Sequence, residues 1–125
     1  MTTMRFRVAV VEDDAGVRTA LRQLLRSAAY DARTFVSAEE FLAAGGESEA
    51  DCLIADINLP GMSGVALLQA LRAKAPVRAV LITGRDDPAT LELIARAGGV
   101  TVLRKPFSDS DLFAAINDVL KEIEP

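Results

Sequence analysis

Acidic side chains follow two apolar runs of this sequence, each at the point where the run ends. Glu12 and Asp13 come directly after residues 8–11, and Asp56 comes shortly after residues 52–54. Short apolar runs of this kind are typical of buried strands. In open α/β sheets the carboxyl ends of parallel strands share one edge, which is where such folds place their chemistry. We therefore expect the three carboxylates to lie close together.

A hydroxyl and a cation follow two later apolar runs. Thr83 comes directly after residues 80–82, and Lys105 follows residues 100–103 after one arginine. Taken alone, an Asp at a strand end is most simply a turn residue, and a lone Thr or Lys carries no chemical signal. Together, at the ends of four different strands, these side chains indicate a functional site.

Three carboxylates at one edge would need a positive partner. At roughly 5 Å, each pair repels by about 3 kcal/mol at an effective dielectric constant of about 20. The sequence has no histidine and one cysteine, so the ligands are oxygens, which favours Mg²⁺ with several retained waters. Mg²⁺ and Lys105 together offset Glu12, Asp13 and Asp56, and a phosphoryl group on Asp56 would leave about one negative unit. The sequence therefore predicts a magnesium site that can hold phosphate.

The same side chains suit phosphoryl transfer. Asp56 would attack phosphorus to form an acyl phosphate, while Mg²⁺ and Lys105 neutralise the developing charge and the Thr83 hydroxyl binds a phosphoryl oxygen. Asn58, two residues after Asp56, cannot transfer a proton, and a phosphatase needs a nearby acid or base to hydrolyse its intermediate quickly. We therefore expect the phosphoryl group to persist, as a signal does.

Apolar strand runs alternate five times with segments of helical spacing. The runs predict strands over residues 5–12, 31–36, 77–83 and 100–104, and a strand from Cys52 that carries Asp56 at its carboxyl end. Helix starts are predicted at Asp14, at the capping box of Ser37 and Glu40, at Asp87, and at Ser108. In the fourth helix we expect Leu91, Ile94 and Ala95 to face inward. The alternation predicts an α/β fold: a flavodoxin-like, doubly wound, five-stranded parallel sheet of order 2-1-3-4-5 with five helices on two faces.

Composition limits the classes of protein and partner. The chain has 125 residues, half of them apolar, and a formal charge of −4. We expect a single domain over 1–125, with a linker to an absent output domain beginning near residues 122–125. An acidic domain is a poor match for direct binding of nucleic acid or anionic membrane, so the expected partner is a protein.

Cysteine usage and the N-terminus indicate the compartment. Cys52, the one cysteine, lies in an apolar run and is expected to be a small buried side chain rather than a reactive thiol. The first apolar run is too short for a signal peptide or a membrane span. We therefore expect a cytoplasmic protein.

Five ordered motifs resemble the receiver domain of bacterial two-component response regulators, and the resemblance covers essentially the whole chain. They are Val11-Glu12-Asp13-Asp14, the run from Asp56 to Gly64, Leu81-Ile82-Thr83-Gly84, Ala97-Gly98 and Lys105-Pro106-Phe107.

The resemblance assigns roles to the acidic and amide residues. It implies Asp56 as the phosphoacceptor, Asp13 as a direct Mg²⁺ ligand, Glu12 as the acid beside it, and Asn58 as the donor of a backbone carbonyl to the metal. The phosphodonor would be a histidine kinase or a histidine phosphotransfer protein, which supplies the imidazole that this chain lacks.

It also assigns the cation, the hydroxyl and the output. Lys105 would pair with the phosphate, through a Lys105-Pro106 bond that is typically cis in the family, and Thr83 would be the switch hydroxyl. The domain would catalyse only its own phosphorylation and slow dephosphorylation. Phosphorylation would shift the surface of the fourth helix, fifth strand and fifth helix, which controls an output domain, a protein effector or a homodimer.

Val102 departs from the family pattern, which usually has Tyr or Phe three residues before the lysine. Valine has no ring or hydroxyl and a stiff χ1, so the family's inward turn of an aromatic side chain is not available. One interpretation is that coupling runs instead through the loop from Thr83 to Asp87 and the fourth helix. The other is that Val102 only fills the core and the output face lies elsewhere.

Two other functions compete with the receiver interpretation. A haloacid-dehalogenase-like phosphatase also uses an Asp nucleophile with Mg²⁺, but its motif has a second Asp where this chain has Asn58. A nucleotide- or flavin-binding domain of the same topology would need a glycine-rich phosphate loop after the first strand. Acids occupy that position here, which argues against this class.

Overall fold

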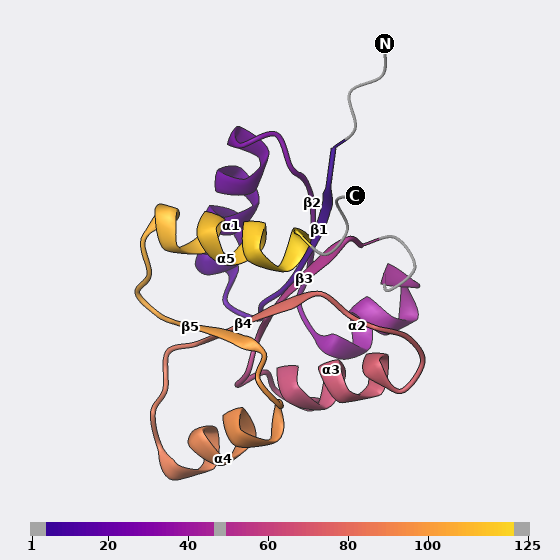
Figure 1. The fold of residues 1–125 in the computed structure, drawn as a ribbon, viewed down its shortest axis with the longest axis vertical. Helices are drawn as coiled ribbons and strands as arrows, with labels where there is room; N and C mark the ends of the chain where they lie inside the picture. Colours follow the sequence, from indigo (N-terminus) through magenta and orange to yellow (C-terminus); the bar gives the residue numbers. More distant parts are fainter. Residues whose placement is uncertain (1–4, 47–49, 122–125) are drawn as a thin grey trace.

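The computed structural model describes residues 5–46 and 50–121, in which strands and helices alternate. The elements are β1 (Arg7–Val11), α1 (Ala15–Ser27), β2 (Asp31–Phe35), α2 (Ala38–Ala43), β3 (Cys52–Asp56), α3 (Gly64–Arg72), β4 (Ala79–Thr83), α4 (Pro88–Arg96), β5 (Thr101–Arg104) and α5 (Asp109–Leu120). The strands form one parallel sheet in the order β2-β1-β3-β4-β5 (Figure 1). The predicted flavodoxin-like architecture is confirmed.

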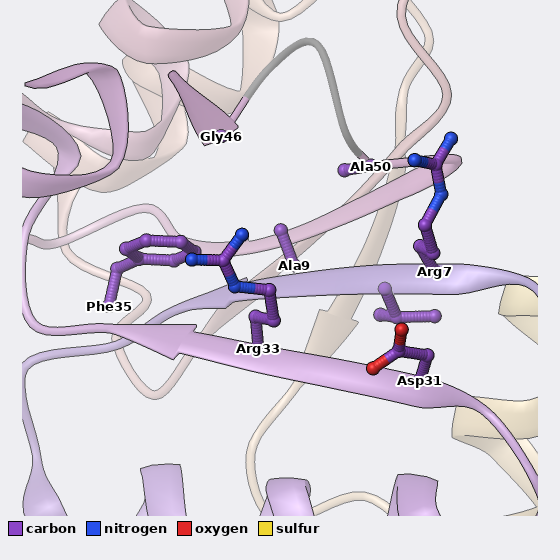
Figure 2. Close-up of a pocket in the computed structure, with 8 residues that line it drawn as sticks. Arg7, Ala9, Asp31, Arg33, Phe35, Gly46 and Ala50 are labelled. Carbon is purple, nitrogen blue, oxygen red and sulfur yellow. The ribbon is translucent and has the colours of Figure 1, made fainter. Parts of the chain in front are cut away.

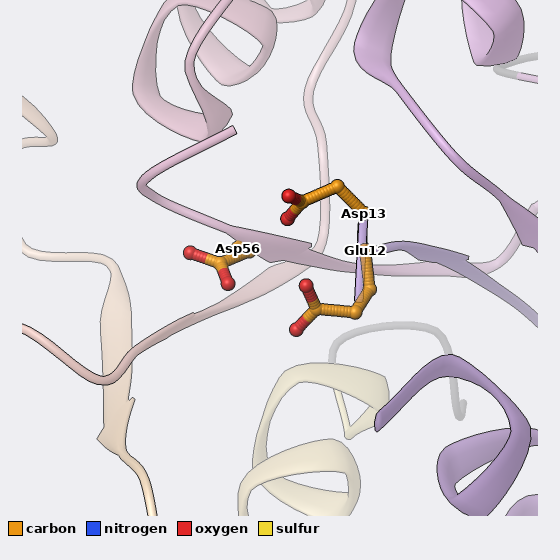
Figure 3. Close-up of side chains that lie close together, drawn as sticks. All are labelled: Glu12, Asp13 and Asp56. Atoms are coloured by element: carbon orange, nitrogen blue, oxygen red, sulfur yellow. The ribbon is translucent and has the colours of Figure 1, made fainter. Parts of the chain in front are cut away.

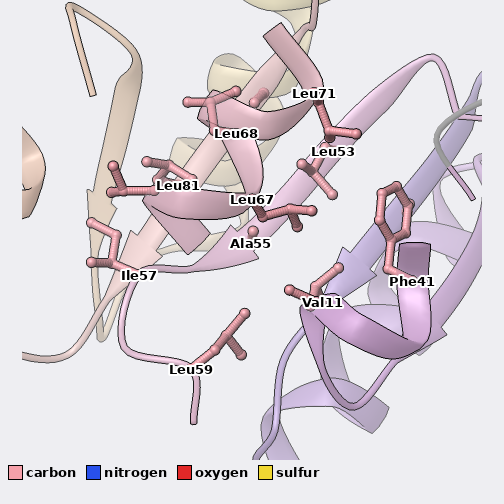
Figure 4. Packing of buried hydrophobic residues seen from close by; sticks show 14 of the residues in the cluster. Val11, Phe41, Leu53, Ala55, Ile57, Leu59, Leu67, Leu68, Leu71 and Leu81 are labelled. Atoms are coloured by element: carbon pink, nitrogen blue, oxygen red, sulfur yellow. The ribbon is translucent and has the colours of Figure 1, made fainter. Parts of the chain in front are cut away.

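Successive side chains of a strand point to opposite faces of the sheet, and the two faces pack against different helices. Val8 and Val10 of β1 belong to the apolar cluster that packs with α1 and α5. Ala9 and Val11 belong to the cluster on the other face, where α2 and α3 supply Phe41, Leu67, Leu68 and Leu71 (Figure 4). Because both faces are covered, β3 and β4 are buried along their whole length.

Strand limits are shorter than predicted in four strands, of which β2 ends at Phe35 rather than at residue 36. β1 covers Arg7–Val11 rather than 5–12, β4 begins at Ala79, and β5 begins at Thr101. In β1, β4 and β5 the strand begins where it meets a neighbour: Arg7 pairs with Asp31, Ala79 with Leu53, and Thr101 with Val80. The predicted linker near residues 122–125 lies outside the described residues.

Side-chain caps begin the helices where the sequence predicted. The cap oxygens of Asp14, Ser37, Asp87 and Ser108 accept backbone N–H groups of the first turn at 2.9 to 3.0 Å. Ser63 caps α3 in the same way at 3.0 Å, which the sequence did not reveal. The Glu40 carboxylate reaches back to the N–H of Val36 at 3.3 Å, one residue before the position that a capping box uses.

The inward face of α4 was predicted one residue out of phase. Leu91 is 47% exposed and Ala95 is exposed, so both expectations were wrong, whereas Ile94 packs against the core. Thr90, only 1% exposed, takes the inward position instead. The polar Thr90 hid the correct phase, because a periodicity based on apolar residues passes over a buried hydroxyl.

Cys52 lies inside β3 and is 1% exposed. Burial, with a smaller contribution from the charge of Asp51, raises the pKa of its thiol to about 12. Since the thiolate is the reactive form, Cys52 acts as a core side chain, as predicted. The helices within residues 5–46 and 50–121 all lack the length and apolar content that crossing a membrane requires.

Candidate functional site

Glu12, Asp13 and Asp56 form a cluster at the carboxyl ends of β1 and β3. Each residue offers a carboxylate oxygen that lies within 4.8 Å of the others (Figure 3). The parallel register causes this: Val11 pairs with Ala55, so the residues that follow each strand emerge side by side. The structure thus brings together the three acids whose proximity was predicted from the strand ends.

The three acids differ sharply in exposure. Glu12 is 0% exposed and Asp56 is 6% exposed, whereas Asp13 faces solvent. Burial raises the pKa of Glu12 above its usual value, although hydrogen bonds from Lys105 and the Asp14 N–H oppose the shift. An opposite charge is needed to keep such a buried carboxylate ionised.

Lys105 supplies that charge. Its Nζ donates to Glu12 Oε1 at 2.6 Å and to Asp56 Oδ2 at 2.7 Å. Burial acts to lower the pKa of Lys105, but the hydrogen bonds to Asp56 and Glu12 outweigh it, and the pKa is raised. The Lys105 N–H donates to the Thr83 carbonyl at 2.7 Å, and the Lys105-Pro106 peptide bond is cis.

The cluster has the donor set that a divalent cation prefers. Lys105 offsets one of three negative charges, and the oxygens of Glu12, Asp13 and Asp56 are close enough to hold one ion. Carboxylate oxygens are hard ligands that suit Mg²⁺. The residues present therefore fit the predicted metal.

Hydrogen bonds to both carboxylate oxygens hold the Asp56 side chain in one orientation. Oδ1 accepts the N–H of Asn58 at 2.7 Å, and Oδ2 accepts from Lys105. Behind it, Gly64 starts α3 so closely that a Cβ atom would lie 2.3 Å from the Asp56 carbonyl oxygen. Only glycine permits this approach, so Gly64 fixes the backbone at the site, a role that the sequence did not reveal.

Thr83 is fully buried and contacts Asn58. Its Oγ1 donates to Asn58 Oδ1 at 2.7 Å and accepts the Arg85 N–H at 3.1 Å. The amide of Asn58 in turn donates from Nδ2 to Thr90 Oγ1 at 2.9 Å. The sequence suggested for Asn58 a backbone carbonyl for the metal and a side chain that cannot transfer a proton, but no contact with Thr83 or Thr90, and it carried no signal for Thr90.

A second residue that the sequence missed is Arg18 of α1. Its Nη1 donates to the backbone carbonyls of Glu12 at 2.9 Å and Asp13 at 3.2 Å. These bonds fix the loop that carries both acids. An arginine early in a helix is too common to indicate such a contact from sequence.

Val102 is half-buried in β5, where it pairs with Leu81 and packs against the apolar cluster of α2 and α3. This packing agrees with the interpretation that Val102 fills the core. The other interpretation, which concerns movement, stays a prediction.

The described part of the chain also has hollows beside and away from the carboxylate cluster. A cavity of about 210 Å³ reaches the beginnings of β1 and β2, where Arg7 and Asp31 line it, at the other end of β1 from Glu12 (Figure 2). A broad groove of about 850 Å³ runs from α1 to Lys105 and Phe107. The groove therefore borders the side of the site where Lys105 lies.

Comparison with known proteins identifies the family. Residues 8–117 match the model of the response regulator receiver domain. The transcriptional regulatory protein FixJ of Bradyrhizobium diazoefficiens is 34% identical over 98% of this chain, which covers 60% of FixJ. The DNA-binding response regulator MtrA of Mycobacterium tuberculosis is 32% identical over 97% of this chain, which covers 53% of MtrA.

A solved structure agrees with both. The CheY-like receiver domain protein of Methanospirillum hungatei superposes with a TM-score of 0.85 at 28% identity, covering 97% of this chain and 98% of its own. The chain spans somewhat more than half the length of the curated relatives described above. On these matches and this fold, the chain belongs to the response regulator receiver domain family.

Proposed function

We propose that this receiver domain is the phosphoacceptor of a two-component phosphorelay, and that Asp56 receives the phosphoryl group. One observation carries the proposal: the buried Asp56 carboxylate is oriented by Lys105 and the Asn58 N–H beside two further carboxylates. A buried carboxylate with both oxygens fixed and a neighbouring cation has the features of a prepared nucleophile.

The donor is a phosphohistidine on a histidine kinase or a histidine phosphotransfer protein. This chain has no histidine, so the imidazole comes from the partner. A carboxylate oxygen of Asp56 forms a bond to phosphorus as the P–N bond breaks, and the leaving imidazole keeps the bonding electrons and takes up a proton. The product is an acyl phosphate on Asp56.

Charge at the site supports this transfer. Lys105, already 2.7 Å from Asp56, would pair with the phosphoryl oxygens, and the Thr83 hydroxyl would donate to one of them. Glu12, Asp13, Asp56 and the Asn58 carbonyl would hold Mg²⁺, which neutralises charge on the transferring group when bound.

The response to phosphorylation is carried by contacts of this domain with other domains or proteins. FixJ and MtrA are named as a transcriptional regulator and a DNA-binding response regulator, and this acidic domain is a poor match for DNA itself. As the family resemblance implies, phosphorylation would shift the α4-β5-α5 surface. That surface would control an output domain, an effector or a homodimer in the cytoplasm. The receiver would catalyse no reaction beyond its own phosphorylation and slow dephosphorylation.

A haloacid-dehalogenase-like phosphatase is the second candidate, since it would use the same nucleophile and metal. The side chain of Asn58 argues against it. That amide is bonded to Thr83 and Thr90 and offers no acid or base to release phosphate.

Intact-mass measurement separates the two functions. With acetyl phosphate and Mg²⁺, the wild-type protein and Asp118→Asn, a surface control on α5, should each gain one phosphoryl group. Asp56→Ala should gain none, and EDTA should prevent the gain. Sizing chromatography of the same samples reports whether a dimer forms. Steady turnover of a phosphate ester, with no stable adduct, would overturn the proposal in favour of the phosphatase.

A further inference from the structure

A continuous line of hydrogen bonds joins the phosphorylation site to the first turn of α4. Thr83 Oγ1 donates to Asn58 Oδ1 at 2.7 Å, Asn58 Nδ2 donates to Thr90 Oγ1 at 2.9 Å, and Thr90 Oγ1 donates to Asp87 Oδ1 at 3.0 Å. We propose that the Asn58 side chain transmits the state of Asp56 to α4 through Thr90, which makes Thr90 a positioning residue of the switch. This inference rests on the proposed phosphorylation of Asp56.

The direction of each bond in the line follows from the carboxylate at its end. An ionised carboxylate only accepts, so the Thr90 hydroxyl must donate to Asp87. Thr90 can then only accept from Asn58, which must turn its NH₂ group toward α4 and its oxygen toward Thr83. The Thr83 hydroxyl must therefore donate to Asn58, since an amide oxygen can only accept.

Burial keeps water from the two hydroxyl groups of the line, whereas Asn58 and Asp87 are only partly buried. Thr83 is 0% exposed and Thr90 is 1% exposed. A buried polar group that loses its partner is costly to leave unpaired. We therefore expect these hydrogen bonds to form together. If one of them breaks, the side chains must move to find new partners.

The Thr83 hydroxyl has only one proton to donate. When Thr83 donates to a phosphoryl oxygen on Asp56, Asn58 Oδ1 loses its donor. The half-buried amide of Asn58 then turns to new partners, which removes the donor that Thr90 accepts and frees the start of α4. Two arrangements thus exclude each other: Thr83 bonded to Asn58 with Thr90 held, and Thr83 bonded to phosphate with Thr90 released.

This route fits the core around β5. Val102 has no ring that could turn inward, so a rotamer change at this strand cannot carry the signal. The path through Asn58 and Thr90 reaches α4 directly from the β3 end of the site, without passing through β5.

Thermodynamic linkage predicts whether a Thr90 variant binds a ligand of the active arrangement more tightly or more weakly. The bond between Asn58 and Thr90 exists only in the resting arrangement, so removing it shifts the protein toward the active one. A ligand that selects the active arrangement must then bind more tightly by the same factor. Beryllofluoride with Mg²⁺, a stable mimic of the aspartyl phosphate, is the probe.

The test compares beryllofluoride affinity, by fluorine NMR, and amide exchange along α4. Thr90→Val removes the hydroxyl at nearly constant volume and should tighten binding about threefold to tenfold, the worth of one hydrogen bond. Its α4 amides should exchange rapidly even without beryllofluoride. Thr90→Ser keeps the hydroxyl and should restore wild-type affinity. Should Thr90→Val fail to fold, Thr90→Ala takes its place.

Ser37→Ala is the matched control. It removes one helix-capping hydrogen bond, on α2 and away from Asn58, and should lower stability without changing beryllofluoride affinity. Wild-type affinity and a wild-type exchange response in Thr90→Val, or in the Thr90→Ala variant that replaces it, would overturn the inference and leave the phosphoacceptor function intact. Failure of the wild-type protein to bind beryllofluoride would overturn both.

Discussion

The ammonium group of Lys105 lies 2.7 Å from Asp56 Oδ2, although β4 separates their strands in the sheet. The contact spans the ends of three strands. It holds the Asp56 carboxylate in place and offsets part of its charge.

Removing this cation should destabilise the protein. In Lys105→Met, Glu12 and Asp56 lose the ammonium group that bonds to both carboxylates, in side chains that are 1% and 8% exposed. In EDTA we expect the free energy of unfolding in urea to fall by about 3 kcal/mol, and Mg²⁺ to restore part of it. Lys121→Met, at an exposed ion pair, should change it by less than about 0.5 kcal/mol. An equal effect of the two variants would contradict the assigned role of Lys105.

Removing the charge of Asp13 should instead raise the free energy of unfolding, because Asp13 is the exposed acid of the cluster. Asp13→Asn relieves repulsion, so in EDTA we expect unfolding to require about 1 kcal/mol more, the value for two charges near 4 Å in a water-like dielectric. The stabilisation produced by Mg²⁺ should shrink in the same variant. If Mg²⁺ raised the melting temperature equally in both proteins, Asp13 would not be a ligand.

Gly64→Ala should damage the backbone that carries Asp56. The added Cβ would lie 2.3 Å from the Asp56 carbonyl oxygen and 3.2 Å from Ile57 Cα, so α3 must move away. We expect a loss of about 1–3 kcal/mol in unfolding free energy together with slower phosphorylation. Gly84→Ala is the control, because its nearest Cβ contact is an ordinary 3.7 Å. A Gly64→Ala protein as stable as Gly84→Ala would show that the close approach is not needed.

Acid should weaken the start of α4 through Asp87. The N–H of Thr90, with smaller help from Arg85 and the Thr90 hydroxyl, lowers the pKa of Asp87 below 3.8. The ionised form of Asp87 is therefore favoured in the folded state. The stability that it contributes to the fold is present above pH 3.8 and is lost as the pH falls through the pKa of the folded protein.

Urea unfolding of the wild type and Asp87→Ala at several pH values measures this effect. The difference between them should be constant near neutral pH and shrink below pH 3.8. Ser108→Ala removes a cap that does not ionise, so its difference from the wild type should not shrink. An Asp87 difference that grew in acid would reverse the assigned sign.

The sequence predicted the strand ends well because each apolar run stops at a charged or polar residue. That rule placed Asp56, Thr83 and Lys105 at one edge, and the parallel register then brought Asp56 and Lys105 into contact. Charge counting predicted that the acids need a positive partner, and Lys105 lies between two of them. These inferences need only the direction of the strands and their order.

Contacts that depend on which way a polar side chain faces could not be predicted in the same way. Thr90 looks like an ordinary first-turn threonine, and only the packing of α4 shows that it is buried and bonded to Asn58. The same packing left Leu91 exposed. Gly64 was missed because its role depends on how the loop after Asp56 folds back on the strand end, and Arg18 because its contact is made by a flexible side chain.

The most direct test of the account locates the phosphoryl group itself. Borohydride reduces an aspartyl phosphate to homoserine, so peptide mapping of the reduced protein identifies the modified aspartate. After reaction with acetyl phosphate and Mg²⁺, we predict homoserine at position 56 alone, and none when EDTA is present. Homoserine at Asp13 instead, or no homoserine in a protein that has gained phosphate, would contradict the account.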